Sequence, residues 1–275
     1  MIEAKQITTR WLRFPGGKRK ALTFSYDDAV IEDKRLVEIF RKNGLKATFN
    51  LNSGLLGKQP YRLTKDEAIA TYTDDVCEVA CHGLTHATAT YCDTAALCTE
   101  VIEDRKNLED LFGKRINGMA YANGIYPDYF VDICRSAGIY YSRTVTSTHS
   151  FNLPEDWLRL NPTCHHDDPE LFNLADKFFA YHGSWAPVLF YVWGHSYEFR
   201  DKNNWERIEE FAEKMRDQDD VWYATNMEIY LAWRDYKRLE CSADGHLIYN
   251  PSPRSVWFEI ATGIYEVKPF SEIIV

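Results

Sequence analysis

Residues 21–28 read ALTFSYDD, an apolar run of strand-forming side chains that ends in two adjacent carboxylates. Residues 33–43 follow with apolar side chains at helical spacing, and Gly44 stands where such a helix would stop. Residues 47–51 (ATFNL) then predict a second strand. The run at 21–28 therefore opens a strand–helix–strand unit.

The same alternation continues to residue 236. Thr64 and Glu67 form a capping-box pattern that predicts a helix start, and Asp93 predicts the cap of a long helix. The run at 187–193 (PVLFYVW) is almost entirely apolar, as a strand buried on both faces requires. Seven to eight such units favour a distorted (β/α) barrel over an open sheet. Further strands are expected at 77–81, 116–121, 139–143, 157–160 and 221–225, and further helices at 127–137, 169–180, 205–215 and 227–236.

The helical spacing stops near residue 238. Short strand-like runs separated by Pro, Gly and Ser follow to the end of the sequence. We therefore expect a catalytic barrel at 1–237 and a small C-terminal antiparallel β appendage at 238–275.

Composition excludes several classes of protein. Of the 275 residues, 45% are hydrophobic, which indicates a globular chain, and the net charge of −9 disfavours nucleic acid as a partner. No apolar run approaches the ~20 residues that cross a bilayer, so no membrane partner is expected. The N-terminus lacks the apolar core of a signal peptide, and the cysteine count of 7 is odd. Both features favour a cytoplasmic protein with reduced thiols; the oligomeric state is not predicted.

Chemically active side chains follow three of the expected strands. Asp27 and Asp28 follow the first, His82 and His86 follow the strand at 77–81, and His195 follows the strand at 187–193. The carboxyl ends of barrel strands meet at one mouth, where active sites assemble. Two histidines four residues apart can face one divalent metal, and a nearby carboxylate completes an open three-ligand site. The alternatives are a solvated turn at the aspartates and structural histidines elsewhere.

Three motifs carry a family resemblance. TFSYDDA at 23–29, HGLTH at 82–86 and WGH at 193–195 resemble successive motifs of the polysaccharide deacetylase family, carbohydrate esterase family four. The resemblance extends over roughly 18–236. It implies removal of an acetyl group from a sugar by metal-activated water, with an acetylated saccharide as the partner. It also implies one divalent metal, which the mixed N/O ligand set predicts to be zinc, with cobalt, nickel or manganese as alternatives.

The resemblance assigns a role to each residue of these motifs. It implies that Asp27 is the general base, that Asp28, His82 and His86 hold the metal, and that His195 is the general acid. Metal and backbone N–H groups would stabilise the oxyanion.

The sequence departs from the family pattern at four places. Ser25 and Tyr26 precede the aspartate pair, and Gly83 replaces a hydroxyl residue. Ala120 and Ala122 replace the Arg and Pro of a third motif, which runs 120–124 here. Trp193 stands where the family has Leu, so the wall for the acetyl methyl group is altered. With Tyr121 and Asn123, Trp193 is expected to contact the substrate.

The missing arginine leaves the base without the charge that orients it in the family. Arg159 lies in the expected strand at 157–160, so we predict that it orients Asp27 from there; the alternative is an ordinary surface arginine. Two other functions stay open, namely hydrolysis of a different small amide and a catalytically silent carbohydrate-binding relative. The run His165-His166-Asp167-Asp168 is expected in a loop at the mouth.

Overall fold

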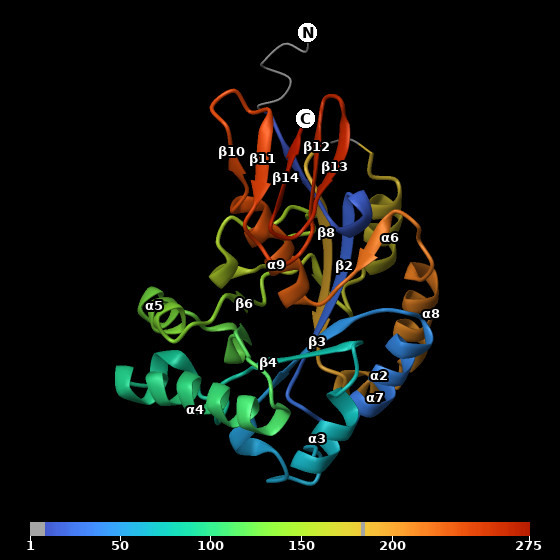
Figure 1. The fold of residues 1–275 in the computed structure, drawn as a ribbon. Helices are drawn as coiled ribbons and strands as arrows, with labels where there is room; N and C mark the ends of the chain where they lie inside the picture. Colours follow the sequence, from blue (N-terminus) through green and yellow to red (C-terminus); the bar gives the residue numbers. More distant parts are fainter. Residues whose placement is uncertain (1–8, 183–184) are drawn as a thin grey trace.

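A curled sheet of parallel strands forms the centre of the computed structural model, which describes residues 9–182 and 185–275 (Figure 1). Its strand order is β6-β5-β4-β3-β2-β8-β7, and β9 pairs with β2 beside β3. All of its pairings are parallel, so the carboxyl ends of neighbouring strands lie at one edge. The strands are β2 (Lys20–Asp27), β3 (Ala47–Leu51), β4 (Cys77–Cys81), β5 (Gly118–Ala120), β6 (Tyr141–Arg143), β7 (Cys164–His165), β8 (Val188–Gly194) and β9 (Val221–Tyr223).

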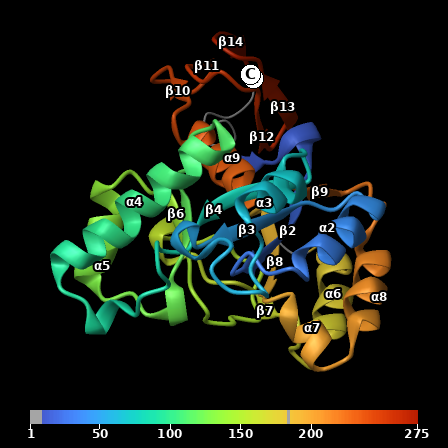
Figure 2. The same cartoon turned by 90° about the horizontal axis from the view of Figure 1, so that it is seen from below.

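Helices surround this sheet and give the expected distorted (β/α) barrel. Seen from below, α4 and α5 lie on one side and α2, α6 and α8 gather on the other (Figure 2). The expected caps are confirmed: Thr64 and Glu67 form a capping box, and Asp93 accepts from the backbone N–H of Ala96. The helices are α2 (Asp33–Lys42), α3 (Lys65–Tyr72), α4 (Thr94–Phe112), α5 (Asp128–Ser136), α6 (Leu171–Phe179), α7 (Tyr197–Asp201), α8 (Trp205–Met215) and α9 (Asn226–Lys237).

The two central strands are buried along their whole length. Every residue of β2 and of β8 is buried, as the continuous apolar run of β8 predicted. Their register places Ser25 beside Trp193 and Tyr26 beside Gly194. Asp27 and His195 therefore emerge at the same end of the sheet.

One expected strand is wrong. Residues 157–160 were expected to be extended, but Trp157–Arg159 forms a 3-10 helix in which the Asp156 side chain accepts from the backbone N–H of Leu158. Four residues are too few for their apolar pattern to distinguish a strand from a tight turn, and the Asp156 cap stabilises the turn. A single parallel bridge joins Arg143 to Leu160, so this segment continues the sheet beyond β6 without forming a strand.

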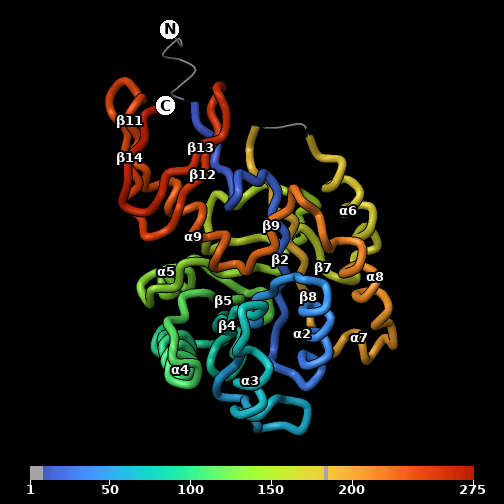
Figure 3. Tube along the Cα trace, turned by 45° about the vertical axis from the view of Figure 1, so that its right-hand side comes forward, coloured from blue at the N-terminus to red at the C-terminus, as the bar shows by residue number. Residues whose placement is uncertain are grey.

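Short antiparallel strands form the C-terminal appendage. They are β10 (Glu240–Cys241), β11 (Leu247–Asn250), β12 (Val256–Ile260), β13 (Gly263–Val267) and β14 (Ser271–Ile274), which form a separate group in Figure 3. They enclose a small core of Ile248, Phe258, Ile260 and Val267. The N-terminal strand β1 (Trp11–Arg13) pairs with β12, so the appendage takes one strand from the other end of the chain. The domain boundary at 237/238 stays a prediction.

The appendage and α7 lie at opposite ends of the molecule in Figure 1. Because α7 follows the carboxyl end of β8, the appendage adjoins the end of the barrel away from Asp27 and His195. Within the described residues, no helix is both long enough and apolar enough to span a membrane.

Candidate active site

The structure brings the motif residues together at the carboxyl ends of β2, β4 and β8. Asp27 Oδ2 lies 3.7 Å from His82 Nε2 and 3.8 Å from His195 Nε2. Asp28 Oδ1 lies 3.8 Å from His86 Nε2. These five side chains, expected at the mouth from the sequence, therefore form one polar cluster.

A turn of unusual backbone geometry presents both aspartates to this cluster. Asp27 is the last residue of β2, and Asp28 and Ala29 then adopt φ values of 88° and 50°. Residues other than glycine rarely adopt a positive φ. Such strained backbone conformations cluster at functional sites. Without this turn, adjacent residues of a strand would point to opposite faces.

Charged and polar neighbours keep the Asp27 carboxylate ionised. Asn50 donates to Oδ1 at 2.8 Å, and Arg143 forms an ion pair with Oδ2. Burial alone raises the pKa of Asp27, but Arg143, His82, His195 and the Asn50 hydrogen bond outweigh it and lower this pKa to about 2. The Asp27 carboxylate is therefore ionised at neutral pH and can accept a proton.

Arg143, and not Arg159, supplies the positive charge beside Asp27. The side chain of Arg143 is fully buried, and its guanidinium lies 4.3 Å from the ring centroid of Trp193. Arg159 instead pairs with Asp128 at 2.6 Å and with Asp156. The expectation for Arg159 failed because the segment that carries it is not a strand and turns its guanidinium toward α5.

Asp28, His82 and His86 are arranged to hold a cation. One ligand atom from each lies within 4.8 Å of the other two. The Nδ1 of His82 is 2.9 Å from the carbonyl oxygen of Ala120, so it carries the proton and leaves the Nε2 lone pair free. Arg62 donates to Asp28 Oδ1 at 3.1 Å and fixes that carboxylate. A mixed nitrogen and oxygen donor set with one oriented imidazole fits a divalent metal such as zinc.

His195 is held by a residue that the sequence analysis missed. Glu198, on α7, places Oε1 3.6 Å from His195 Nδ1 and accepts from the His195 backbone N–H at 3.3 Å. Burial lowers the pKa of His195, but Glu198 and Asp27 outweigh it, so this pKa is raised. A carboxylate three residues after a histidine is the signal that could have identified Glu198, because the turn before α7 brings the two residues together: the Glu198 backbone N–H donates to the His195 carbonyl at 3.1 Å.

The sequence from residue 15 to residue 142 matches the family model described as polysaccharide deacetylase. Over this segment the chain is similar to the polysaccharide deacetylase family. The matched segment contains Asp27, Asp28, His82 and His86, whereas Arg143, His195 and Glu198 lie beyond it.

Solved structures share the deacetylase fold at low sequence identity. A putative polysaccharide deacetylase from Mycobacterium smegmatis is 16% identical, with a TM-score of 0.61 over 82% of this chain and 94% of that one. A CE4 family pseudoenzyme from Bacillus anthracis is 16% identical, with a TM-score of 0.52 over 80% of this chain and 68% of that one. The chain spans 61% of a Streptococcus pyogenes deacetylase, which is 21% identical with a TM-score of 0.46 over 50% of this chain. No curated protein matches the sequence.

Two of the three expected substrate contacts are buried in this structure. Tyr121 is 1% exposed and donates its hydroxyl to the carbonyl of Leu158, so its side chain belongs to the core and the expectation was wrong. Trp193 is 9% exposed beneath Arg143, which makes it a wall of the site. Asn123 is exposed and donates to Thr88 Oγ1 at 2.8 Å; its contact with substrate stays a prediction.

A pocket of about 330 Å³ opens beside the candidate metal ligands. Asp28 lines it together with Tyr61, Arg62 and Tyr197. Neither tyrosine could be predicted from the sequence, because nothing in their spacing distinguishes them from core aromatics. Amphipathic aromatic rings suit the faces of a sugar.

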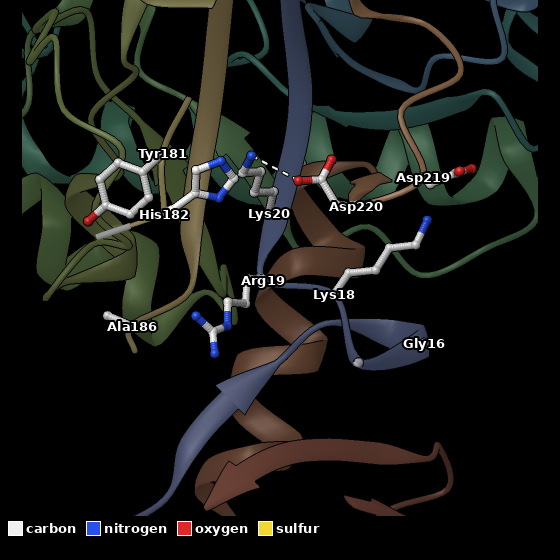
Figure 4. A pocket seen from close by; sticks show the side chains of 10 residues that line it. Gly16, Lys18, Arg19, Lys20, Tyr181, His182, Ala186, Asp219 and Asp220 are labelled. Carbon is white, nitrogen blue, oxygen red and sulfur yellow. Dashed lines mark ion pairs between the residues drawn. The ribbon is translucent and has the colours of Figure 1, made fainter. Parts of the chain in front are cut away.

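Another hollow, of about 360 Å³, lies at the opposite end of β2 (Figure 4). Its cationic side chains are already engaged: Lys20 pairs with Asp220 at 2.8 Å, and Lys18 donates to the carbonyl of Val221. The candidate active-site cluster is therefore at the other end of the barrel from this hollow.

Proposed function

We propose that this protein is a metal-dependent hydrolase that removes acetyl groups, N- or O-linked, from a sugar or oligosaccharide. The position of Asp27 carries the proposal. An ionised carboxylate lies between a set of metal ligands on one side and a protonatable histidine on the other. That arrangement is what amide or ester hydrolysis by activated water requires.

Each protein group has a distinct task in this proposal. A divalent cation held by Asp28, His82 and His86 supplies Lewis acidity, which lowers the pKa of water and polarises the acetyl carbonyl. Asp27 accepts the proton of the attacking water, and Arg143 and Asn50 hold its carboxylate in place. His195 donates a proton to the departing amine or alkoxide, and its raised pKa keeps that proton available.

The residues at the mouth fit a saccharide. Tyr61 is 45% exposed in the pocket beside Asp28, and the ring of Tyr197 lies 5.1 Å from that of His195. We assign the sugar to this pocket, with its acetyl group directed toward Asp27. A catalytically silent binding relative would need neither an ionised base nor a held acid, so both features favour an enzyme.

The test measures acetate release and metal content on the same preparations. The zinc-loaded protein should release acetate from acetylated chito- or xylo-oligosaccharides, and chelation should abolish release until zinc is returned. Asp27→Asn is the matched control, because it removes the base and leaves Asp28, His82 and His86 in place. Release that survives chelation, or that equals the rate of Asp27→Asn, would exclude the proposal.

A further inference from the structure

A second cluster of side chains that could hold a metal ion lies beside the active site and includes none of Asp28, His82 and His86. His165, His166, Asp167 and Glu198 each offer one atom, and these atoms lie within 4.8 Å of one another. His165 is the last residue of β7, His166 and Asp167 follow it, and Glu198 lies on α7. The run from His165 was expected at the barrel mouth without a role, and of this cluster the proposed hydrolysis uses only Glu198, through its contact with His195.

The separations in this cluster match those around a bound metal ion. His165 Nε2 and His166 Nε2 lie 3.1 and 3.0 Å from Glu198 Oε2, and His166 Nε2 is 3.5 Å from Asp167 Oδ2. Around a tetrahedral zinc with bonds of about 2.0–2.1 Å, neighbouring ligand atoms are about 3.3 Å apart.

The buried imidazole of His166 gives a second observation that favours a bound cation here. The residue is 0% exposed, and neither of its ring nitrogens has a hydrogen-bond partner within the described part of the chain. Its Nε2 approaches Glu198 to 3.0 Å without the alignment of a hydrogen bond. Buried imidazole nitrogens are costly to leave unpaired, so a group that binds a lone pair at this point would be stabilising.

The surrounding packing fixes the ring of His166. It stacks on Phe199 with centroids 4.1 Å apart and on Tyr26 at 5.7 Å. A Cβ atom added to Gly194 would lie 2.1 Å from His166 Nδ1, so the glycine of the motif at 193–195 makes room for this imidazole. A rigidly held, buried imidazole beside a carboxylate is a preorganised ligand pair.

From these contacts we propose that His165, His166 and Glu198 bind a second divalent cation of the zinc type, with Asp167 as the fourth ligand. Two histidines and a glutamate form a set that zinc accepts. Asp167 already has other partners: Lys202 contacts its Oδ2, and Asn204 and Arg207 lie 3.4 and 3.8 Å from its Oδ1.

Binding requires one contact to change. The backbone N–H of Asp167 donates to His165 Nδ1 at 3.2 Å, which places the ring proton on Nε2. Coordination through Nε2 moves that proton to Nδ1 and gives up this hydrogen bond, which is at the long limit for its type. Glu198 also lies beside His195, with Oε1 3.6 Å from its Nδ1. The same carboxylate would therefore contact both the cation and the candidate general acid.

The experiment counts zinc equivalents bound by the chelator-treated full chain in calorimetric titrations, with circular dichroism as the check on folding. Wild type should bind two equivalents. His165→Gln and Glu198→Gln should each bind one, and the double variant His82→Ala/His86→Ala should also bind one. Adding His165→Gln to that double variant should abolish binding. His149→Gln is the matched control, because its exposed imidazole pairs with Asp168 outside the cluster, and it should keep both equivalents.

Each alternative result bears on the inference. A wild-type protein that binds one equivalent, lost in His82→Ala/His86→Ala, would overturn the second site and leave the proposed function intact. A second equivalent that persists in both His165→Gln and Glu198→Gln would overturn it as well. One equivalent lost in His165→Gln but kept in His82→Ala/His86→Ala would support the second site and count against the proposed function.

Discussion

Ala120 and Arg143 are register partners on the adjacent parallel strands β5 and β6. The family resemblance led us to expect an arginine at position 120, and the structure has one directly beside that position, one strand away. The guanidinium of Arg143 still reaches Asp27 Oδ2. The charge that orients the base is therefore retained in space although it is absent from the motif.

This relationship predicts the effect of changing Arg143. Arg143→Lys keeps the charge but loses the planar contact with Trp193 and the fixed geometry at Asp27, so turnover should fall by ~10–10²-fold. The pKa of Asp27 should rise, because Arg143 is its main charged partner. The acidic limb of the pH–rate profile should therefore shift to higher pH, which initial rates measured from about pH 2, the pKa of Asp27, up to neutral pH would detect.

Arg159→Lys is the control for this prediction. Its ion pairs with Asp128 and Asp156 are partly exposed, so both turnover and the acidic limb should stay within error of wild type. A shift in Arg159→Lys that equals the shift in Arg143→Lys would contradict the assignment.

The strand-end residues could be predicted from the sequence, whereas their supporting residues could not. Asp27, His82 and His195 follow recognisable strands, and parallel strands bring their carboxyl ends to one edge. Arg143 contacts Asp27 and Glu198 contacts His195 from other elements of the fold. Apolar periodicity does not predict such side-chain contacts or the strand register behind them. Arg159 was selected because it lies at the end of the strand expected at 157–160, and so near the mouth, whereas the side chain of Asp156 caps a 3-10 helix there.

Substituting Asp27 and Asp28 one at a time should distinguish the role of the base from the role of the metal ligand. Asp27→Asn removes the proton acceptor but keeps the ligand set, so turnover should fall below detection at unchanged zinc affinity. Asp28→Asn replaces a charged ligand with a neutral one, so zinc affinity should fall first and turnover should recover in part at high zinc. Zinc titration paired with acetate release measures both, and equal loss of zinc in the two variants would show that the roles are assigned wrongly.

Glu198 should set the upper pH limit of activity. Its carboxylate stabilises the imidazolium form of His195, so Glu198→Gln should lower the pKa of His195. The proton donor would then be lost at lower pH, and the descending limb of the pH–rate profile should move to lower pH. The profile should be recorded at saturating zinc, and His149→Gln should leave it unchanged. A descending limb at the same pH in Glu198→Gln would contradict the role of Glu198.

The last prediction concerns stability and a buried carboxyl group on α2. Asp33 is fully buried, where Ser196 donates to its Oδ1 and Tyr72 donates to its Oδ2 at 2.6 Å. Burial raises the pKa of Asp33 to about 7, although both hydrogen bonds oppose the rise. An unfolded Asp has a pKa of about 3.9, so the folded state holds the proton more tightly. The stability from this group is fully present below pH ~4 and is lost as pH rises through ~7.

Asp33→Asn should therefore flatten the loss of stability between pH 4 and 8, because the amide keeps the shape of the carboxyl group and cannot ionise. At pH 8 the gain relative to wild type is on the order of 1–4 kcal/mol, since one pKa unit corresponds to about 1.4 kcal/mol. Urea unfolding at several pH values measures this difference. Asp176→Asn is the matched control, because its carboxylate is 65% exposed and pairs with Lys214 at the surface. A wild-type protein whose free energy of unfolding rises between pH 4 and 8, with the same slope in Asp33→Asn, would exclude a protonated Asp33 in the folded state.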